Sequence, residues 1–373
     1  MVDLKGQYLK IKDEVDAAIQ SVIDSTSFIG GPAVTTFAAH LSAYMGGCHV
    51  IPCANGTDAL QIALMALGLK PGDEVIVPAF TYVASAEVIG LLGLTPVMVD
   101  VDPRTFNVTV EHIKHGLSAR TRAVIPVHLF GQSCDMEPIL AFAQEHGLYV
   151  VEDNAQALGA EYTFSDGRRA KTGTMGTIGC TSFFPSKNLG CYGDGGALFT
   201  SDDVLAERIR MMANHGQQVK YHHKVIGCNS RLDALQAAVL DVKLRHLDGY
   251  CCARHAAAAY YTERLKAFDP EERYIETPVE TTNSTHVYHQ YTLRVQGGRR
   301  DALKARLAEA GIPSMIYYPL PLQEQEAFKG IARTAESLDV ARVCADSVLS
   351  LPMHTELTRE VQDTVLKAVC EFF

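Results

Sequence analysis

Short apolar runs alternate with stretches of helical periodicity between residues 57 and 200. We expect strands at the apolar runs EVIVP (74–78), TPVMVDVD (95–102), AVIPVHLF (123–130) and LYVVED (148–153). Helical spacing of apolar residues predicts helices over 57–69, 82–92, 110–117 and 136–147. Apolar strands separated by helices indicate an α/β protein with a parallel sheet that is covered on both faces. Ligands of such sheets bind beyond the carboxyl ends of the strands.

The pattern changes in the last third of the chain. Residues 230–264 are mostly helical and contain no proline, so this segment can bridge two lobes. Further on, a strand is expected at 290–295 and helices at 299–310 and 359–372. We therefore predict a large domain of residues 1–245 and a smaller α+β domain of residues 246–373, with the N-terminal helix able to pack on the smaller domain.

Composition and charge exclude several classes of function. The chain has 373 residues and a formal net charge of -10, so no basic surface for nucleic acid is expected. No apolar run approaches the ~18 residues that span a bilayer, and the first residues lack the apolar core of a signal peptide, which predicts a cytoplasmic protein. The ten cysteines have no CxxC spacing, and the histidines form no metal-binding pattern. We expect free thiols and no metal.

The first candidate for chemistry is ANGTDAL (54–60), directly before a predicted helix. Gly56 permits another group to approach the backbone closely, and Thr57 or Asp58 is expected to begin the helix. Amides at a helix N-terminus bind phosphate well. An ordinary Thr or Asp cap explains the same residues, and taken alone it is the better explanation. Because GxGxxG and GxxxxGK[ST] are absent, dinucleotide and P-loop sites are disfavoured.

The second candidate is VVEDNAQA (150–157), at the end of a predicted apolar strand. Asp153 ends the strand, and Gln156 follows three residues later. A carboxylate at that place needs a donor or a cation, because burying it unpaired is costly. Asp153 could bind a protonated ring nitrogen, but it could equally cap the next helix or bind an internal arginine.

The third candidate is TSFFPSKNLGCYGDGGA (181–197), where Lys187 lies between an apolar run and a loop with four glycines. Three roles are open for Lys187: gripping a phosphate, forming an imine with a carbonyl, or lying at the surface. The first is disfavoured, because no glycine-rich loop leads into the lysine. A lysine in partly apolar surroundings near other cations has a lowered pKa and a nucleophilic amine. Ser182 lies just before the aromatic pair.

Tyr82 begins the helix that follows EVIVPAFT, and its ring could stack on a planar ligand. A core tyrosine on the buried face of that helix is the alternative. The helix-start amides, the aromatic ring, the strand-end acid and the lysine fall on separate junctions between elements. Together they could hold the phosphate, ring face, ring nitrogen and aldehyde of one cofactor, pyridoxal 5′-phosphate.

Six motifs in the chain carry a resemblance to a known family. They are NGTDAL, PAFTYVASAE, EDNAQALGA, SFFPSKNLGCYGDGGA, HGQ and NSRLDALQAA. The chain resembles the sugar-nucleotide aminotransferases of the DegT/DnrJ/EryC1/StrS family over nearly its whole length. This resemblance implies fold type I of the pyridoxal-phosphate-dependent transferases, which is aspartate aminotransferase-like, with a mostly parallel central sheet and a smaller α+β C-terminal domain.

The resemblance also implies a role for each site residue. Lys187 would be the Schiff-base lysine, and Asp153 would pair with the pyridinium nitrogen. Gln156 would lie beside the ring hydroxyl and Tyr82 would stack on the ring. The phosphate would be bound by Gly56, Thr57 and Ser182.

Active sites of the family lie at a homodimer interface, so the resemblance implies a homodimer. Asn229 would reach the phosphate in the neighbouring subunit. Arg231 would enter the same neighbouring site, where its guanidinium suits a uronate carboxylate. An ion pair at a helix start is the alternative role of Arg231. Many relatives have His-Tyr-Pro where this chain has Tyr317, Tyr318 and a proline, so one substrate contact has changed type.

The motifs CTSFFPSKNLGCYGDGGA and YHHKVIGCNSRLDALQAA are similar to those of enzymes that aminate C3 of UDP-2-acetamido-2-deoxy-3-oxo-glucuronic acid in bacterial surface-polysaccharide pathways. The resemblance therefore implies transfer of an amino group from glutamate to such a sugar. A neutral UDP- or dTDP-linked ketohexose, aminated at C3 or C4, is the alternative substrate. A non-catalytic protein that binds the cofactor is the alternative function. Relatives that dehydrate sugars carry histidine in place of this lysine, so Lys187 favours transamination.

Overall fold

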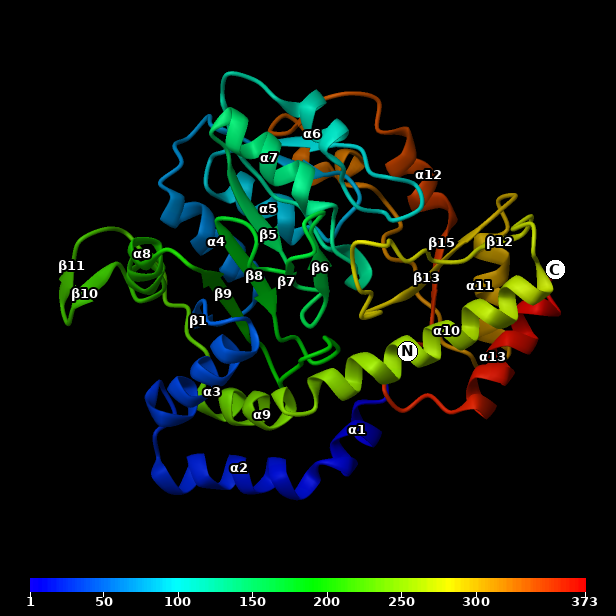
Figure 1. The fold of residues 1–373 in the computed structure, drawn as a ribbon, viewed down its shortest axis with the longest axis horizontal. Helices are drawn as coiled ribbons and strands as arrows, with labels where there is room; N and C mark the ends of the chain where they lie inside the picture. The colour runs from blue at the N-terminus through cyan, green and yellow to red at the C-terminus, as the bar shows by residue number, and fades with distance from the viewer.

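The computed structural model describes all 373 residues and is built around one eight-stranded sheet (Figure 1). In spatial order its strands are β1 (His49–Cys53), β9 (Gly196–Thr200), β8 (Ile178–Ser182), β5 (Tyr149–Asp153), β4 (Thr121–Val124), β2 (Glu74–Pro78), β3 (Thr95–Val99) and β14 (Arg333–Thr334). Only β9 runs antiparallel to its neighbours, β1 and β8. The predicted mostly parallel sheet is confirmed.

Both faces of the sheet are buried, as the uninterrupted apolar strands predict. On β2, Val75 and Val77 pack in one core and Ile76 packs in a second core on the opposite face. The first core includes residues of α4 (Gly56–Leu67), α5 (Ala84–Leu91) and α8 (Asp203–Ala213). The second includes residues of α6 (Val110–Gly116) and α7 (Met136–His146).

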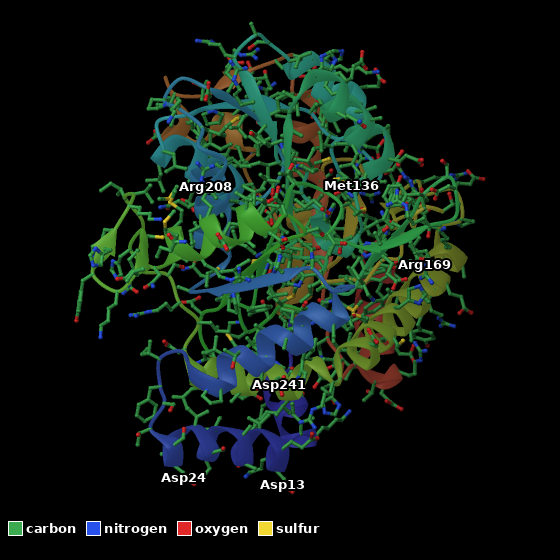
Figure 2. All side chains as sticks on the ribbon, turned by 60° about the vertical axis from the view of Figure 1, so that its left-hand side comes forward. Asp13, Asp24, Met136, Arg169, Arg208 and Asp241 are labelled. Carbon is green, nitrogen blue, oxygen red and sulfur yellow. The ribbon has the colours of Figure 1, made fainter.

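The N-terminal helices form a layer below the β1 side of the sheet. They are α1 (Leu4–Lys10), α2 (Lys12–Ser25) and α3 (Gly31–Tyr44), and they pack with α9 (Ala234–Leu244). In Figure 2, Asp13 and Asp24 mark the ends of α2 at the bottom edge of the molecule, and α9 with Asp241 lies between that helix and the sheet. Helix α9 therefore connects the outer helices to the core of the molecule.

The C-terminal part contains its own antiparallel sheet. Its strands are β12 (Ile275–Glu276), β13 (Tyr291–Val295) and β15 (Val348–Leu351), and its helices are α10 (Leu247–Phe268), α11 (Arg300–Glu309) and α13 (Arg359–Cys370). Helix α10 runs from the end of α9 to the right-hand side of Figure 1, where it packs against α13. Gln7 of α1 donates to Thr355 Oγ1 (3.3 Å), so the N-terminus contacts this part of the chain. We retain the division at residue 245 as a proposal.

Shorter elements complete the fold. They are β6 (Glu161–Thr163), β7 (Arg169–Lys171), β10 (Gln217–Val219), β11 (His222–His223), α12 (Asp339–Ser347) and the 3-10 turns Leu129–Gly131, Leu322–Glu324 and Glu326–Phe328. None of the helices has the length and apolar character required to cross a membrane.

The strand expected over residues 123–130 is shorter than predicted. Strand β4 ends at Val124, and Leu129–Gly131 forms a 3-10 turn instead. Pro126 lacks an N–H for the ladder, and Phe130 adopts a left-handed backbone conformation with φ of 58°. An apolar run alone does not distinguish a strand from a buried turn, which explains the difference.

An ion cluster around a buried carboxylate joins β14, a strand from the C-terminal part, to the edge of the large sheet. Glu74 is fully buried and accepts hydrogen bonds from Arg120 (2.6 Å), Arg333 (2.9 Å) and Ser118 (2.7 Å). Burial opposes ionisation of Glu74, but these hydrogen bonds outweigh it and hold the pKa below its usual value of 4.5. Arg333 belongs to β14, so the cluster joins two distant parts of the sequence.

Glu74→Gln should lower the free energy of unfolding by roughly 2 kcal/mol, because it removes the buried carboxylate that binds the partly exposed guanidinium groups of Arg120 and Arg333. The difference in free energy of unfolding between the wild-type protein and this variant should be largest above pH 4.5. It should disappear as the pH falls through the lowered pKa of Glu74 in the folded protein. Urea denaturation followed by circular dichroism measures both effects. Glu111→Gln, which breaks an exposed pair with Lys114, is the control and should change little.

Candidate active site

A cavity of about 700 Å³ opens at the carboxyl ends of the central strands. Nine of the eleven predicted site residues line it: Gly56, Thr57, Tyr82, Asp153, Gln156, Ser182, Lys187, Tyr317 and Tyr318. Asp153 ends β5 and Ser182 ends β8, so the site lies where a parallel sheet is expected to bind ligands. The structure thus brings together residues that are up to 262 positions apart, from 56 to 318.

The start of helix α4 forms one wall of the cavity. Asn55 is the cap, and its Oδ1 accepts from the backbone N–H of Asp58 (2.8 Å). The expected Thr57 or Asp58 cap is therefore wrong, and the helix begins at Gly56. The amides of Gly56 and Thr57 have no intrahelical partner at this position, so they are available to a ligand.

Gly56 is required by the close approach of β8. A Cβ atom at this position would lie 2.7 Å from Cβ of Ser182, which is too close for any other residue. The hydroxyl of Ser182 accepts from the N–H of Phe184 (3.2 Å). Two free amides and two hydroxyl groups, those of Thr57 and Ser182, therefore meet around one small space, which is the chemistry of a phosphate site.

Asp153 is 5% exposed and is held by two donors. Ser85 Oγ donates to its Oδ2 (2.8 Å), and the N–H of Ala155 donates to its Oδ1 (3.1 Å). No arginine contacts Asp153, and no helix follows it for at least twenty residues, so neither alternative role applies. The carboxylate faces the cavity with a fixed orientation, which suits an acceptor for a ring N–H.

Gln156 links three parts of the cavity wall. Its Oε1 accepts from the N–H of Phe130 (2.7 Å), and its Nε2 donates to Tyr318 Oη (3.0 Å). The left-handed conformation of Phe130 belongs to the turn that presents this N–H. Burial raises the pKa of Tyr318, which keeps its hydroxyl protonated. Gln156 thus fixes the shape of the wall beside Asp153.

The side chain of Tyr82 is 56% exposed and lines the cavity. A core position on the buried face of α5 is therefore excluded. Its ring lies 6.1 Å from the ring of Tyr318, measured between centroids. An exposed aromatic face above a cavity is free to stack on a planar ligand.

Lys187 is half-buried, lines the cavity, and its amine has no hydrogen-bond partner in the chain. Burial lowers its pKa to about 8, and the nearby Asp153 carboxylate opposes that change. A surface position and a phosphate-gripping role both fit poorly with this environment. A desolvated amine with a lowered pKa and no partner is suited to attack a carbonyl.

Several cavity residues had no role in the sequence analysis. They are Asn55, Thr81, Phe184, Asp194, His289 and Gln290. His289 is buried, and burial together with the charges of Lys187 and Arg254 keeps its pKa far below the usual value, so the ring is neutral. His289 and Gln290 precede β13, far from the motifs in sequence, and only the fold reveals their position.

Asn229 and Arg231 do not line the cavity of their own chain. Both side chains are exposed, between the β10–β11 hairpin and α9. Arg231 forms no ion pair within the chain, so the alternative of a pair at a helix start does not apply. Both side chains are therefore free to contact another molecule.

The residues of the cavity fit pyridoxal phosphate. The amides of Gly56 and Thr57 and the hydroxyl of Ser182 would hold its phosphate, Asp153 its ring nitrogen, and Lys187 its aldehyde. The fold and this set of side chains define the class of pyridoxal-phosphate-dependent transferases. The signature of the DegT/DnrJ/EryC1/StrS aminotransferase family matches residues 9–370, and the chain belongs to that family. It is an aminotransferase that uses pyridoxal phosphate.

Curated relatives match the chain over almost its full length. UDP-2-acetamido-2-deoxy-3-oxo-D-glucuronate aminotransferase of Pseudomonas aeruginosa is 47% identical over 99% of this chain and 98% of its own. A pleiotropic regulatory protein of Geobacillus stearothermophilus is 46% identical over 100% and 98%. UDP-N-acetyl-3-dehydro-α-D-glucosamine 3-aminotransferase of Acidithiobacillus ferrooxidans is 44% identical over 96% and 94%.

Solved structures agree with these relatives. DesV of Streptomyces venezuelae, in complex with a ketimine intermediate, has a TM-score of 0.93 and 41% identity, covering 100% of this chain and 97% of that one. NtdA of Bacillus subtilis, with bound cofactor PMP, has a TM-score of 0.88 and 30% identity, covering 97% and 82%. The predicted fold type and cofactor are confirmed.

In the cofactor-free protein, the amine of Lys187 should titrate with a pKa of about 8. Asp153→Asn should lower that pKa further, because the carboxylate raises it. The reactivity of Lys187 towards acetic anhydride at pH 7 should then rise about two- to threefold. Peptide mass spectrometry after acetylation at a series of pH values measures this, and the exposed Lys329 in the same digest should react equally in both proteins. An unchanged Lys187 titration curve would contradict the contact between the two groups.

Proposed function

We propose that this aminotransferase transfers an amino group from glutamate to C3 of a UDP-linked 3-oxo sugar, with UDP-2-acetamido-2-deoxy-3-oxo-glucuronic acid as its substrate. The observation that carries the proposal is the partnerless, desolvated amine of Lys187 in one cavity with Asp153. Amination at C3 of a UDP sugar rests on the named activities of the Pseudomonas and Acidithiobacillus relatives, and the uronate rests on that of the Pseudomonas relative. A place in surface-polysaccharide synthesis in the cytoplasm follows from the same resemblance.

The side chains have distinct tasks in this proposal. The amides of Gly56 and Thr57, with the hydroxyl of Ser182, bind the phosphate. Pyridoxal phosphate, when bound, supplies a ring that stabilises negative charge on the carbon next to the amino group. Asp153 would keep the ring nitrogen protonated. Lys187 Nζ would act as general base when it removes the proton from the donor carbon that bears the amino group, and as general acid when the same nitrogen, now protonated, gives that proton back to complete the transfer.

Charges in the cavity support a shared site in a homodimer. The cavity wall contains three carboxylates, those of Asp58, Asp153 and Asp194, and a single cationic side chain, Lys187. A phosphorylated cofactor and a nucleotide sugar are both strongly anionic, so one chain alone presents the wrong charge balance for them. Exposed Arg231 can correct this balance from a neighbouring subunit. Asn229, two residues earlier, would reach the phosphate in the same way.

Substrate contacts from the same subunit are assigned to Tyr317 and Tyr318, which line the cavity. Burial raises the pKa of Tyr317, so its hydroxyl stays protonated and donates a hydrogen bond to a sugar oxygen. A neutral ketosugar is the second candidate substrate, favoured by the named activity of the Acidithiobacillus relative. A regulatory protein that binds the cofactor without reacting is the second candidate function, favoured by the name of the Geobacillus relative.

Lys187→Ala should reduce transamination by ~10³-fold or more, because it removes the general base and acid. The visible absorbance band of the bound cofactor should shift in this variant, and glutamate should no longer change it. Lys329→Ala, a substitution of an exposed lysine, is the matched control and should behave as the wild-type protein. A wild-type protein whose absorbance responds to no amino donor would favour the regulatory function instead.

Arg231→Ala should raise KM for the 3-oxo-uronate about 30-fold, which corresponds to the free energy of one charge-assisted hydrogen bond. KM for the neutral 3-oxo sugar should change much less. Equal losses on both substrates would remove the carboxylate contact. Arg210→Ala, another exposed arginine without an ion pair, is the control. Mixing inactive Lys187→Ala subunits with Arg231→Ala subunits should restore about a quarter of the activity, because half of the dimers then contain one intact site. No restoration would place Arg231 outside the partner's site.

A further inference from the structure

The loop that carries Lys187 has no regular structure of its own. Residues 183–195 connect β8 to β9 without a helix or strand. The N–H of Phe183 donates to the carbonyl of Gly195 (2.7 Å), which closes the neck of the loop, and the N–H of Lys187 donates to Phe184 O (2.8 Å). These bonds define turns within the loop. Other parts of the chain hold the loop in place: Asn188 Nδ2, next to Lys187, donates to the carbonyl of Val287 (2.9 Å), and Leu189 and Cys191 pack in a core that includes residues of α9.

Helix α9 adds polar contacts to the part of the loop that follows Lys187, through two side chains. Lys243 Nζ donates to the carbonyl of Gly190 (2.5 Å), three residues after Lys187. Gln236 bonds to both backbone groups of Tyr192: its Oε1 accepts from the N–H (2.8 Å) and its Nε2 donates to the carbonyl (3.3 Å). Gln236 and Lys243 are seven residues apart, about two helical turns, so they project from one face of α9.

One glycine lets the loop lie close to this face of α9. A Cβ atom at Gly193 would lie 2.9 Å from Nε2 of Gln236 and would displace that side chain. A Cβ atom at Gly190 would instead collide with the carbonyl oxygen of Pro185, so Gly190 allows the turn within the loop itself. The contact of the loop with Gln236 therefore requires a glycine at position 193.

Burial of Lys243 inside the protein costs free energy, because its amine is removed from water. Its side chain is 1% exposed and no carboxylate neutralises it. Burial lowers its pKa to about 8. Methionine would fill a similar volume without the penalty of a desolvated amine. The bond to Gly190 is the one hydrogen bond that the amine makes, and bonds from charged donors are about twice as strong as neutral ones. The amine also lies 5.3 Å from the centre of the Tyr192 ring, so both of its contacts are with the loop.

We propose that Lys243 and Gln236 form a brace on α9 that sets the position of the Lys187 amine in the cavity. Both are positioning residues, since they act through the loop and do not line the cavity. The inference rests on the proposed role of Lys187 as the reactive amine. The brace also connects the loop to the exposed segment of Arg231, which directly precedes α9, so the same helix orients the groups that a chain offers to its own site and to a neighbour's.

The test compares Lys243→Met and Gln236→Leu with the wild-type protein. Each should lower kcat about tenfold with KM for glutamate changed less than about twofold, because a displaced base slows chemistry more than binding. In cofactor-free protein, the pKa of Lys187, measured by acetylation and mass spectrometry, should rise above the value of about 8, since a looser loop admits water and reduces desolvation. This second measurement does not depend on transamination, so it separates failure of the brace from failure of the proposed reaction.

Arg300→Met is the matched control for loss of a buried cation. Arg300 is 8% exposed and donates to the carbonyl of Ala345 (2.8 Å), far from the loop in the C-terminal part. This variant should lose stability but leave the titration of Lys187 unchanged. A Lys187 titration that is unchanged in both brace variants would overturn the proposal. A shift in Lys243→Met alone would also overturn it, because the cause would then be the lost charge and not the lost contact. If Lys243→Met does not fold, the Lys187 titration in Gln236→Leu alone tests the proposal.

Discussion

A desolvated amine and a buried carboxylate share one cavity, and much of the structure serves to keep them there. Burial lowers the pKa of Lys187, while Asp153 limits that effect, so the amine titrates close to neutrality. Either group alone would be an expensive feature of a protein interior. The parallel sheet makes the arrangement possible because β5 and β8 end side by side, which brings Asp153 and the start of the lysine loop to the same edge.

Irregular segments carry Lys187 and shape the cavity wall, and buried polar side chains hold these segments in place. The lysine loop is bound by α9, and the turn at Phe130 is bound by Gln156. In the same way, Glu74 binds the edge strand β14 to the sheet. Loops supply the freedom to aim a side chain, whereas helices and strands supply rigidity. In this protein the connection between the two is made by buried polar side chains. Their bonds end on backbone groups or on charged partners that the sequence does not place nearby.

The sequence alone predicted the sheet and its helices well, because apolar periodicity is a local property. Strand β2 was predicted to the residue, and Asp153 and Lys187 were found from their position after apolar runs. The prediction failed where the backbone follows tertiary contacts. The expected strand ended early at Val124, since Phe130 turns to meet Gln156. The cap of α4 was assigned to Thr57 or Asp58, although Asn55 makes it.

Residues that enter the site through the fold could not be found in this way. His289 and Gln290 come from a segment that carries no motif, and Lys243 has the helical spacing of an ordinary buried face. From sequence, a lysine in such a helix is expected to be solvated, because the sequence does not show which face of the helix is covered. The contact of Lys243 with Gly190 is visible only in the structure. Recognition of the substrate's charge also cannot be derived from the sequence of one chain. Carboxylates outnumber cations in the cavity of one chain, so the recognition of an anionic sugar depends on groups, such as Arg231, whose place is defined by a second molecule.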